Sequence, residues 1–204
     1  MDDTAKRALS LLREVKSVTF ATVKGDEPAA RIIDVMLVDD DGLYFVTGRG
    51  KSFYKQLMQN PVVAISGLTK DWAAIRLIGD VRRVEDRALV DRVFEANPMM
   101  NDIYPGETRN ILDGFHLYRG RGEMFDLSSS TPGRERFAFG GAVAARQGYL
   151  ITDLCISCGE CAEACPEGII SDGEPYVIDA RNCLECGRCA EICPVAAIEA
   201  APGL

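Results

Sequence analysis

The sequence predicts an α+β protein in two parts: an antiparallel β-barrel decorated by helices, followed by a small cysteine-rich α+β domain. Two observations predict this division. Residues 17–127 contain many short stretches that alternate apolar and polar residues between turn signals, which is typical of antiparallel strands. All eight cysteines lie after residue 154, in a segment that repeats itself. We therefore expect a barrel over residues 1–127, a linker over 128–147 and a cysteine-rich domain over 148–204.

The elements of the barrel can be assigned in chain order. An amphipathic helix is predicted first, because its apolar residues recur at helical spacing, and later helices stop at Asn60–Pro61 and at Pro98. The turn sequences KGDEP and DDDG separate the first three strands. The predicted helices are 4–16, 51–59 and 85–97, and the predicted strands are 17–23, 29–38, 42–47, 61–68, 72–84 and 114–127.

The stretch between the two parts is rich in Ser, Gly and Pro. Residues 127–141 read LSSSTPGRERFAFGG, which favours a linker over a buried element. The alternation within residues 134–139 allows a short strand there.

The cysteine-rich part contains two copies of one motif. Residues 155–170 and 183–198 align without gaps at an offset of 28 residues, with nine of 16 positions identical. Each copy has the spacing C-x2-C-x2-C-x3-C-P. Thiolates are soft ligands suited to iron–sulfur clusters, and each [4Fe–4S] cube takes four of them. The spacing therefore predicts two [4Fe–4S] clusters.

The fourth cysteine of such a run serves the neighbouring cluster. One cluster is then expected on Cys155, Cys158, Cys161 and Cys193, and the other on Cys183, Cys186, Cys189 and Cys165. Gly159 and Gly187 let the backbone pass close to the cluster and leave N–H groups free to donate to sulfur. A pair of zinc knuckles is the alternative, but zinc sites usually join two CxxC pairs through a longer loop. Residues 148–200 resemble the two-cluster bacterial ferredoxins, which implies one-electron transfer at low potential.

The barrel carries a candidate phosphate site. GRGKS, residues 48–52, opens a helix after the strand that ends at Thr47, and backbone N–H groups there, with Lys51 and Arg31, can grip a phosphate. The sequence is not a P-loop, because the first glycine of that motif would fall at Phe45.

This pattern resembles the FMN-binding split barrel of the pyridoxamine 5'-phosphate oxidase family over residues 5–127. The resemblance rests on Arg31 at a strand, Thr47 at the end of the next, Lys51 before a helix, Asn60–Pro61, and the strand containing residues 78–81. It implies an antiparallel split β-barrel that binds FMN, although deazaflavin-binding relatives share the barrel. We do not expect the oxidase reaction itself, because the C-terminal stretch that binds pyridoxamine in the enzyme is replaced here by the linker and the ferredoxin-like domain.

The same resemblance implies the surroundings of the flavin. Its ring is expected against the segment Ile32, Ile33 and Asp34, and its phosphate end near Gly48, Arg49 and Ser52, besides Lys51. These barrels pair as two-fold dimers with FMN between the subunits, so a homodimer is expected. Trp72 is expected to contribute from the second chain, with core packing as the alternative. We identify no catalytic residue, and a structural or surface role is expected for the single histidine, His116.

Charge and composition limit the partners. The net charge of −8 comes from residues 151–204, which hold 10 acidic and 2 basic residues, whereas residues 1–150 are balanced. Such a surface repels nucleic acid and suits docking to a basic redox protein. The sequence shows no apolar run long enough to span a membrane and no signal peptide, so a cytoplasmic protein is expected.

These features together predict an iron–sulfur flavoprotein oxidoreductase. It would exchange electrons with an external donor or acceptor protein and reduce an organic acceptor through FMN. The alternative is an electron-transfer module that serves a partner protein and has no small-molecule substrate of its own.

Overall fold

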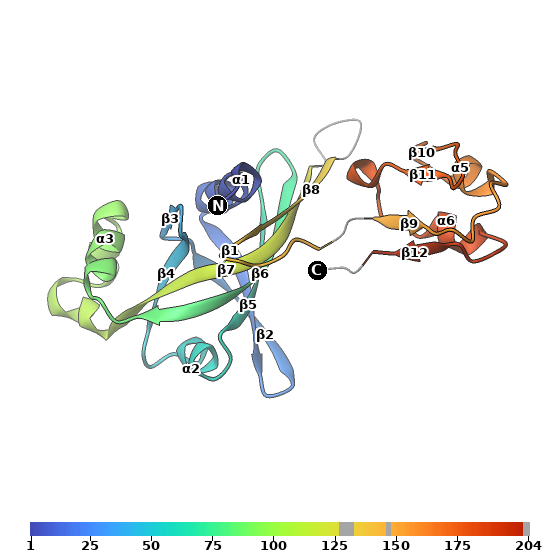
Figure 1. Ribbon diagram of the computed structural model, residues 1–204. Coiled ribbons are helices and arrows are strands. Elements are labelled where there is room, and N and C mark those ends of the chain that lie inside the picture. Colours follow the sequence, from blue (N-terminus) through green and yellow to red (C-terminus); the bar gives the residue numbers. More distant parts are fainter. Residues whose placement is uncertain (127–132, 146–147, 202–204) are drawn as a thin grey trace.

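The computed structural model describes residues 1–126, 133–145 and 148–201, and these form a barrel followed by a smaller C-terminal domain (Figure 1). The helices in these ranges are α1 (Asp3–Val15), α2 (Ser52–Gln59), α3 (Ala88–Ala96), α4 (Met100–Ile103), α5 (Glu160–Ala164) and α6 (Arg188–Ile192), with 3-10 turns η1 (Gly106–Ile111) and η2 (Ala180–Asn182). No helix within the described ranges has the length and apolar composition needed to cross a bilayer.

The barrel strands form one antiparallel sheet. They are β1 (Ser17–Lys24), β2 (Glu27–Asp34), β3 (Leu37–Asp39), β4 (Gly42–Gly48), β5 (Val62–Leu68), β6 (Ala73–Val84), β7 (Leu112–Asp126) and β8 (Gly133–Phe139). Their order in the sheet is β2-β1-β5-β6-β7-β4-β3, with β8 paired to β7 beyond the end of β4. The predicted antiparallel barrel with helices is confirmed.

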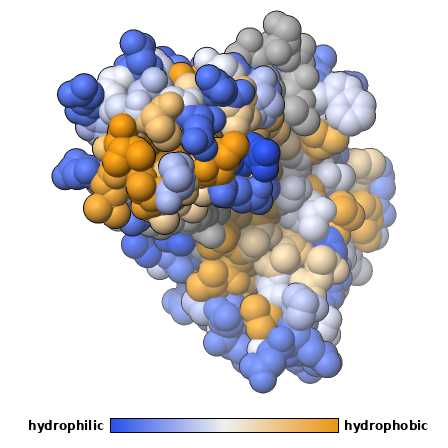
Figure 2. Space-filling view, turned by 90° about the vertical axis from the view of Figure 1, so that its right-hand side faces the viewer, coloured by the Kyte–Doolittle hydropathy of each residue, from blue (hydrophilic) through white to orange (hydrophobic). Residues whose placement is uncertain are grey.

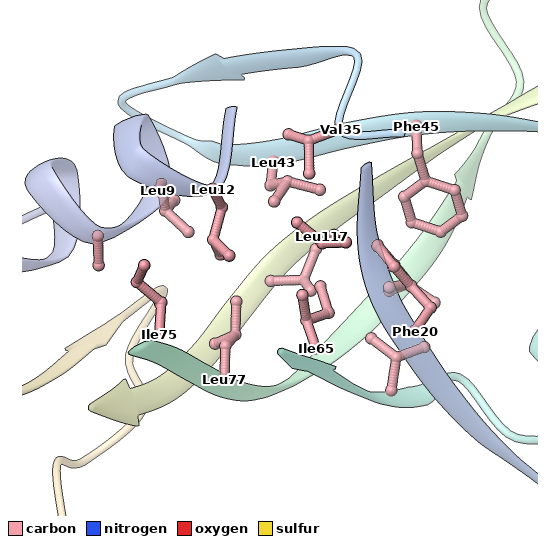
Figure 3. Close-up of a cluster of buried hydrophobic side chains, with 14 of the residues drawn as sticks. Leu9, Leu12, Phe20, Val35, Leu43, Phe45, Ile65, Ile75, Leu77 and Leu117 are labelled. Carbon is pink, nitrogen blue, oxygen red and sulfur yellow. The ribbon is translucent and has the colours of Figure 1, made fainter. Parts of the chain in front are cut away.

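The core of the barrel lies between α1 and the inner face of the sheet (Figure 3). Asp2 caps α1 by accepting a hydrogen bond from the Ala5 N–H at 2.7 Å. The helix buries Leu9 and Leu12 against residues such as Leu117 of β7. Burial of this apolar surface is the main force that closes the sheet around one interior.

The predicted strand 29–38 is two strands in the structure, and the break explains how the barrel closes. The Val35 N–H bonds to the carbonyl of Lys16 beside β1, and the next N–H, of Met36, bonds to Tyr44 in β4. Val35 and Met36 are consecutive, so the chain at this point joins the β2–β1 end of the strand order to the β4–β3 end. The prediction of one continuous strand was wrong because alternation alone does not show where a strand changes neighbours.

A second small core covers the other face of β4, because Tyr44 and Val46 alternate along the strand with Leu43 and Phe45 of the main core. It contains α3, Tyr44 and Val46 of β4, Met100 of α4, and Leu112 at the start of β7. The sequence did not predict α4 or η1, which are short and lie in a loop-like stretch after Pro98.

Strand β8 lies within the predicted linker. Residues 133–139 pair with β7 from Gly133 opposite Asp126 to Phe139 opposite Gly120, and they bury Phe137 and Phe139 in the barrel. This part of the predicted linker is a strand of the barrel sheet. The expected boundary at 127/128 and the expected linker end at 147 lie outside the described residues.

Buried charges connect β8 to the C-terminal domain. Glu123 of β7 lies opposite Arg136 of β8 and also contacts Arg134 and, on its other side, Arg76 of β6. Arg134 and Arg136 reach Glu185 of the C-terminal domain at 3.1 and 2.7 Å. The two arginine side chains are only 6% exposed, and they link the buried Glu123, 2% exposed, to Glu185, which is 29% exposed. We call these four residues, Glu123, Arg134, Arg136 and Glu185, the interdomain ion cluster.

The C-terminal domain has internal pseudo-symmetry. Strands β9 (Tyr149–Ile151) and β12 (Ile198–Ala200) form one pair, and β10 (Ile170–Ser171) and β11 (Val177–Ile178) form another. The five-residue helices α5 and α6 lie at equivalent positions in the two repeats. The predicted α+β fold of this part is confirmed.

Candidate functional site

One candidate site lies where β4 ends and α2 begins. The Thr47 side chain is 2% exposed, and its Oγ1 has no hydrogen-bond partner within the described residues. Lys51 is the N-cap of α2 and provides no side-chain cap, so the first-turn N–H groups lack a side-chain acceptor. Lys51 and Ser52 are exposed at this end. A buried hydroxyl without a partner, an uncapped helix start and a nearby cation fit the phosphate end of a cofactor.

Arg31 links β2 to α2. Its guanidinium donates from Nη1 to Thr22 Oγ1 and from Nη2 to Gln56 Oε1, both at 2.7 Å. It also lies over the Phe53 ring, 4.7 Å from the centroid. Partial burial lowers the pKa of Arg31 from its usual value. The side chain is therefore held against the inner side of α2.

Sequence reasoning missed the polar residues that hold Arg31. Thr22 and Gln56 are almost fully buried and hydrogen-bond to each other at 2.6 Å. Gln56 lies between Phe53 and Leu57 on the buried side of α2. The available sequence signal for this contact was Gln56 itself, a polar residue on an otherwise apolar helix face.

The segment expected beside the flavin ring presents its side chains in two directions. Ile32 is 63% exposed, whereas Ile33 packs against the main core. Asp34 accepts a hydrogen bond from Ser17 Oγ at 2.6 Å. Since side chains alternate along a strand, Ile32 points away from the core, and it is the large apolar side chain that β2 exposes.

Arg49, expected near the phosphate, has its side chain engaged by other residues of the chain. Arg49 turns to Asp113 and to the carbonyl of Asn110, at 2.9 and 2.6 Å. Burial opposes ionisation of Asp113, but hydrogen bonds from Tyr54 and Arg49 outweigh it and lower its pKa.

Trp72 lies in the turn between β5 and β6, at the end of β5 opposite to α2, and is 63% exposed. The alternative that it packs in the core is therefore wrong.

His116 has a structural position, as expected: it is buried, stacks on Tyr44, and contacts Arg82 and the Asp41 carbonyl.

The eight cysteines gather into two groups around two cavities. Counting the space open to solvent at their mouths, the first measures about 320 Å³ and the second about 350 Å³. We call the cavity lined by Cys155, Cys158, Cys161 and Cys193 site A, and the cavity lined by Cys165, Cys183, Cys186 and Cys189 site B. Each site thus takes three cysteines from one repeat and one from the other, the same crossed sets that the spacing predicted.

The backbone of each repeat turns its N–H groups toward sulfur. Ser157 and Glu185 occupy equivalent positions with φ of 56° and 59°, and Gly159 and Gly187 follow with 84° and 81°. This left-handed conformation directs the N–H of Ser157 to Cys155 Sγ at 3.4 Å and that of Glu185 to Cys183 Sγ at 3.3 Å. Such donors stabilise negative charge on sulfur, as an iron–sulfur cluster requires.

The cysteines differ in how readily they ionise. Burial raises the pKa of Cys161 and of Cys189, whereas hydrogen bonds from the N–H groups of Tyr176 and Ser157 lower the pKa of Cys155. Because metal ligands must be deprotonated, loading each site with metal releases protons from its buried thiols. The donor sets fit soft metal centres of several atoms.

Residues 4–122 match the family model described as pyridoxamine 5'-phosphate oxidase. The chain belongs to the pyridoxamine 5'-phosphate oxidase family. Its C-terminal residues 148–194 match the 4Fe-4S dicluster domain. Within this family, the protein therefore combines an FMN-binding type of barrel with a ferredoxin domain.

Individual relatives agree with this division. A NimC/NimA family protein from Clostridium acetobutylicum has 30% identity and a TM-score of 0.60, with 67% of this chain and 92% of that chain covered. A Clostridium acetobutylicum protein related to general stress protein 26, of the pyridoxinephosphate oxidase family, shares the fold at 15% identity and a TM-score of 0.53, with 67% and 96% covered.

The C-terminal part is similar to a ferredoxin from Butyribacterium methylotrophicum, with 58% identity over 31 residues. That match covers 15% of this chain, and the chain spans 56% of the ferredoxin's length.

Proposed function

We propose that this family member is a homodimeric, cytoplasmic iron–sulfur flavoprotein that reduces an organic acceptor. Two [4Fe–4S] clusters in sites A and B would supply single electrons, and FMN in the barrel would supply one- and two-electron chemistry. The observation that carries this proposal is the pair of crossed four-cysteine cavities in a domain that buried ion pairs join to a barrel of this family.

The residues of the barrel have separate roles in this proposal. Lys51 and the N-terminus of α2 bind the phosphate of FMN, and the buried Thr47 hydroxyl gives it a further hydrogen bond. Arg31 keeps β2 against α2 through Thr22 and Gln56. Ile32 presents an apolar side chain where the ring of the flavin is expected, and Trp72 would reach that site from the second chain.

The second candidate function is an electron-transfer module without a substrate of its own. The observation that favours it is the net charge of −8 in residues 151–204, which suits docking to a basic partner protein. Turnover of small organic acceptors by the isolated protein supports the first function, and electron exchange with protein partners alone supports the second.

Anaerobic purification followed by analysis of iron, sulfide and flavin tests the proposal. We expect about eight irons per chain, as two four-iron clusters require, together with one FMN identified by mass spectrometry. Mass spectrometry also distinguishes FMN from a deazaflavin. Colourless protein, or zinc in place of iron, contradicts the proposal.

Replacing Lys51 with Ala is expected to weaken FMN binding roughly 10- to 100-fold, the usual effect of losing one charge-assisted hydrogen bond. The dissociation constant can be measured by flavin fluorescence on reloaded protein, and iron content should stay unchanged. Lys55→Ala is the matched control, because Lys55 is an exposed lysine of the same helix. Equal binding in the two variants would show that Lys51 does not hold the phosphate.

A further inference from the structure

The two repeats of the C-terminal domain differ in what covers them. The loop of site B carries Glu185, which accepts from the Gly148 N–H at 3.1 Å and contacts Arg134 and Arg136 of the barrel. The equivalent residue in the loop of site A is Ser157, whose hydroxyl donates to the Gly173 carbonyl at 3.1 Å, inside the same domain. The barrel therefore lies against the loop of site B.

Exposure follows the same asymmetry. Leu154 and Ile156 flank Cys155, the first cysteine of site A, and they are 66% and 61% exposed. Leu184, the counterpart of Ile156 at site B, is only partly exposed. Figure 2 views the molecule from the side of the C-terminal domain and shows apolar patches bordered by hydrophilic residues there. Two neighbouring, strongly exposed aliphatic side chains beside a redox centre are typical of a contact surface.

Charge is also divided between the repeats. Residues 151–178 contain six acidic residues and no Lys or Arg. Residues 179–204 contain four acidic residues and both arginines, of which Arg181 pairs with Asp179 and Arg188 with Glu191. Six of the ten acidic residues of this domain therefore lie in residues 151–178. Of these, Asp153 and Glu174 lie beside Cys155 of site A, whereas Glu167 lines site B.

A shallow hollow joins the apolar and acidic features. Counted in the same way as sites A and B, including space open to solvent, it measures about 720 Å³, and it is lined by Asp153, Cys155, Ile156, Ser157, Glu174 and Pro175. Both acidic residues in this lining are exposed. The hollow thus reaches from the first cysteine of site A to solvent, with an apolar wall and an acidic rim.

We propose that the surface formed by Asp153, Leu154, Ile156 and Glu174, here called the site A face, docks a soluble electron-carrier protein that has an apolar centre ringed by Lys and Arg. This docking proposal rests on the proposed function, because it gives sites A and B different places in one electron-transfer path. Site B lies against the barrel, and site A is the outer site. Opposite charges steer the partner to the rim, and the exposed aliphatic side chains form the dry centre of a small transient interface.

Calorimetric titration with a basic cytochrome c as the probe partner tests this assignment. The variant Asp153→Lys/Glu174→Lys is expected to bind the probe roughly tenfold or more weakly at low ionic strength, because it reverses the charge of the rim. The matched control, Glu191→Lys/Glu199→Lys, makes the same change in charge in the other repeat and should weaken binding less than about twofold. Carbodiimide cross-links from probe lysines should map to Asp153 and Glu174.

A second variant tests the apolar centre. Ile156→Ser should weaken binding at both low and high ionic strength, since its contribution is not screened by salt. Iron and sulfide are measured on every sample, so loss of a cluster is distinguished from loss of docking. If the wild-type protein contains no iron, the proposed function is wrong. Its binding of the probe is measured separately, so the two failures can be distinguished.

Three results overturn the docking assignment. If the two charge-reversed variants weaken binding of the probe equally, the probe is attracted to the net negative charge of the domain and not to the site A face. Failure of the iron-loaded wild-type protein to bind the probe would show that the face does not accept a basic carrier. Sedimentation showing that Ile156→Ser abolishes self-association would assign the face to a second copy of this chain.

Discussion

Replacing Cys193 with Ala is expected to remove the iron from site A and leave site B loaded, although Cys193 belongs to the second repeat. The cavity of site A is lined by Cys193 together with Cys155, Cys158 and Cys161. Since a cube needs four ligands, iron should fall from about eight to about four per chain. Alkylation followed by mass spectrometry should find the three remaining cysteines of site A reactive.

The reciprocal variant, Cys165→Ala, is the matched control. It should release the thiols of site B, because Cys165 lines that cavity with Cys183, Cys186 and Cys189. If each substitution instead exposes the cysteines of its own repeat, the crossed arrangement is incorrect.

Replacing Glu123 with Ala is expected to destabilise the barrel by about 3–5 kcal/mol, the usual effect of removing one member of a buried ion pair. Glu123 is 2% exposed and contacts Arg134 and Arg136, whose side chains are 6% exposed. Without it, two guanidinium groups stay buried with Glu185 as the remaining carboxylate of the interdomain ion cluster. Thermal unfolding should show a midpoint lower by about 10 °C.

An exposed ion pair provides the control for this prediction. Asp40 contacts Lys6 at 2.9 Å, with side chains 78% and 44% exposed. Asp40→Asn should leave the unfolding midpoint unchanged, because solvent screens such pairs. A small change in the Glu123 variant, similar to that of Asp40→Asn, would mean that the buried arginines find other acceptors.

The features best predicted from sequence were those in which local spacing determines the chemistry. The eight cysteines could be divided into two sets because the interval between them limits which sulfurs meet. Thr47, Lys51 and Ser52 are close in sequence, and the structure keeps them together at the start of α2.

Features that depend on distant residues were not predictable in the same way. Glu123, Arg134 and Glu185 come from three separate stretches, and no local pattern indicates that they meet. Arg31 was singled out, but its partner Gln56 was not, because the pairing depends on α2 folding back over β1 and β2. The break at Val35–Met36 was missed because both flanking strands have the same alternation.

The pairing of β8 with β7 has a consequence for how this fusion can vary. Side chains alternate along a strand, so a one-residue shift in the pairing of β8 with β7 would turn both arginines to the opposite side of the sheet. A two-residue shift would keep their direction but slide them by roughly 7 Å along β7. The register of β8 therefore determines where Arg134 and Arg136 meet the C-terminal domain. A relative with a different register would need other contacts to hold that domain against the barrel.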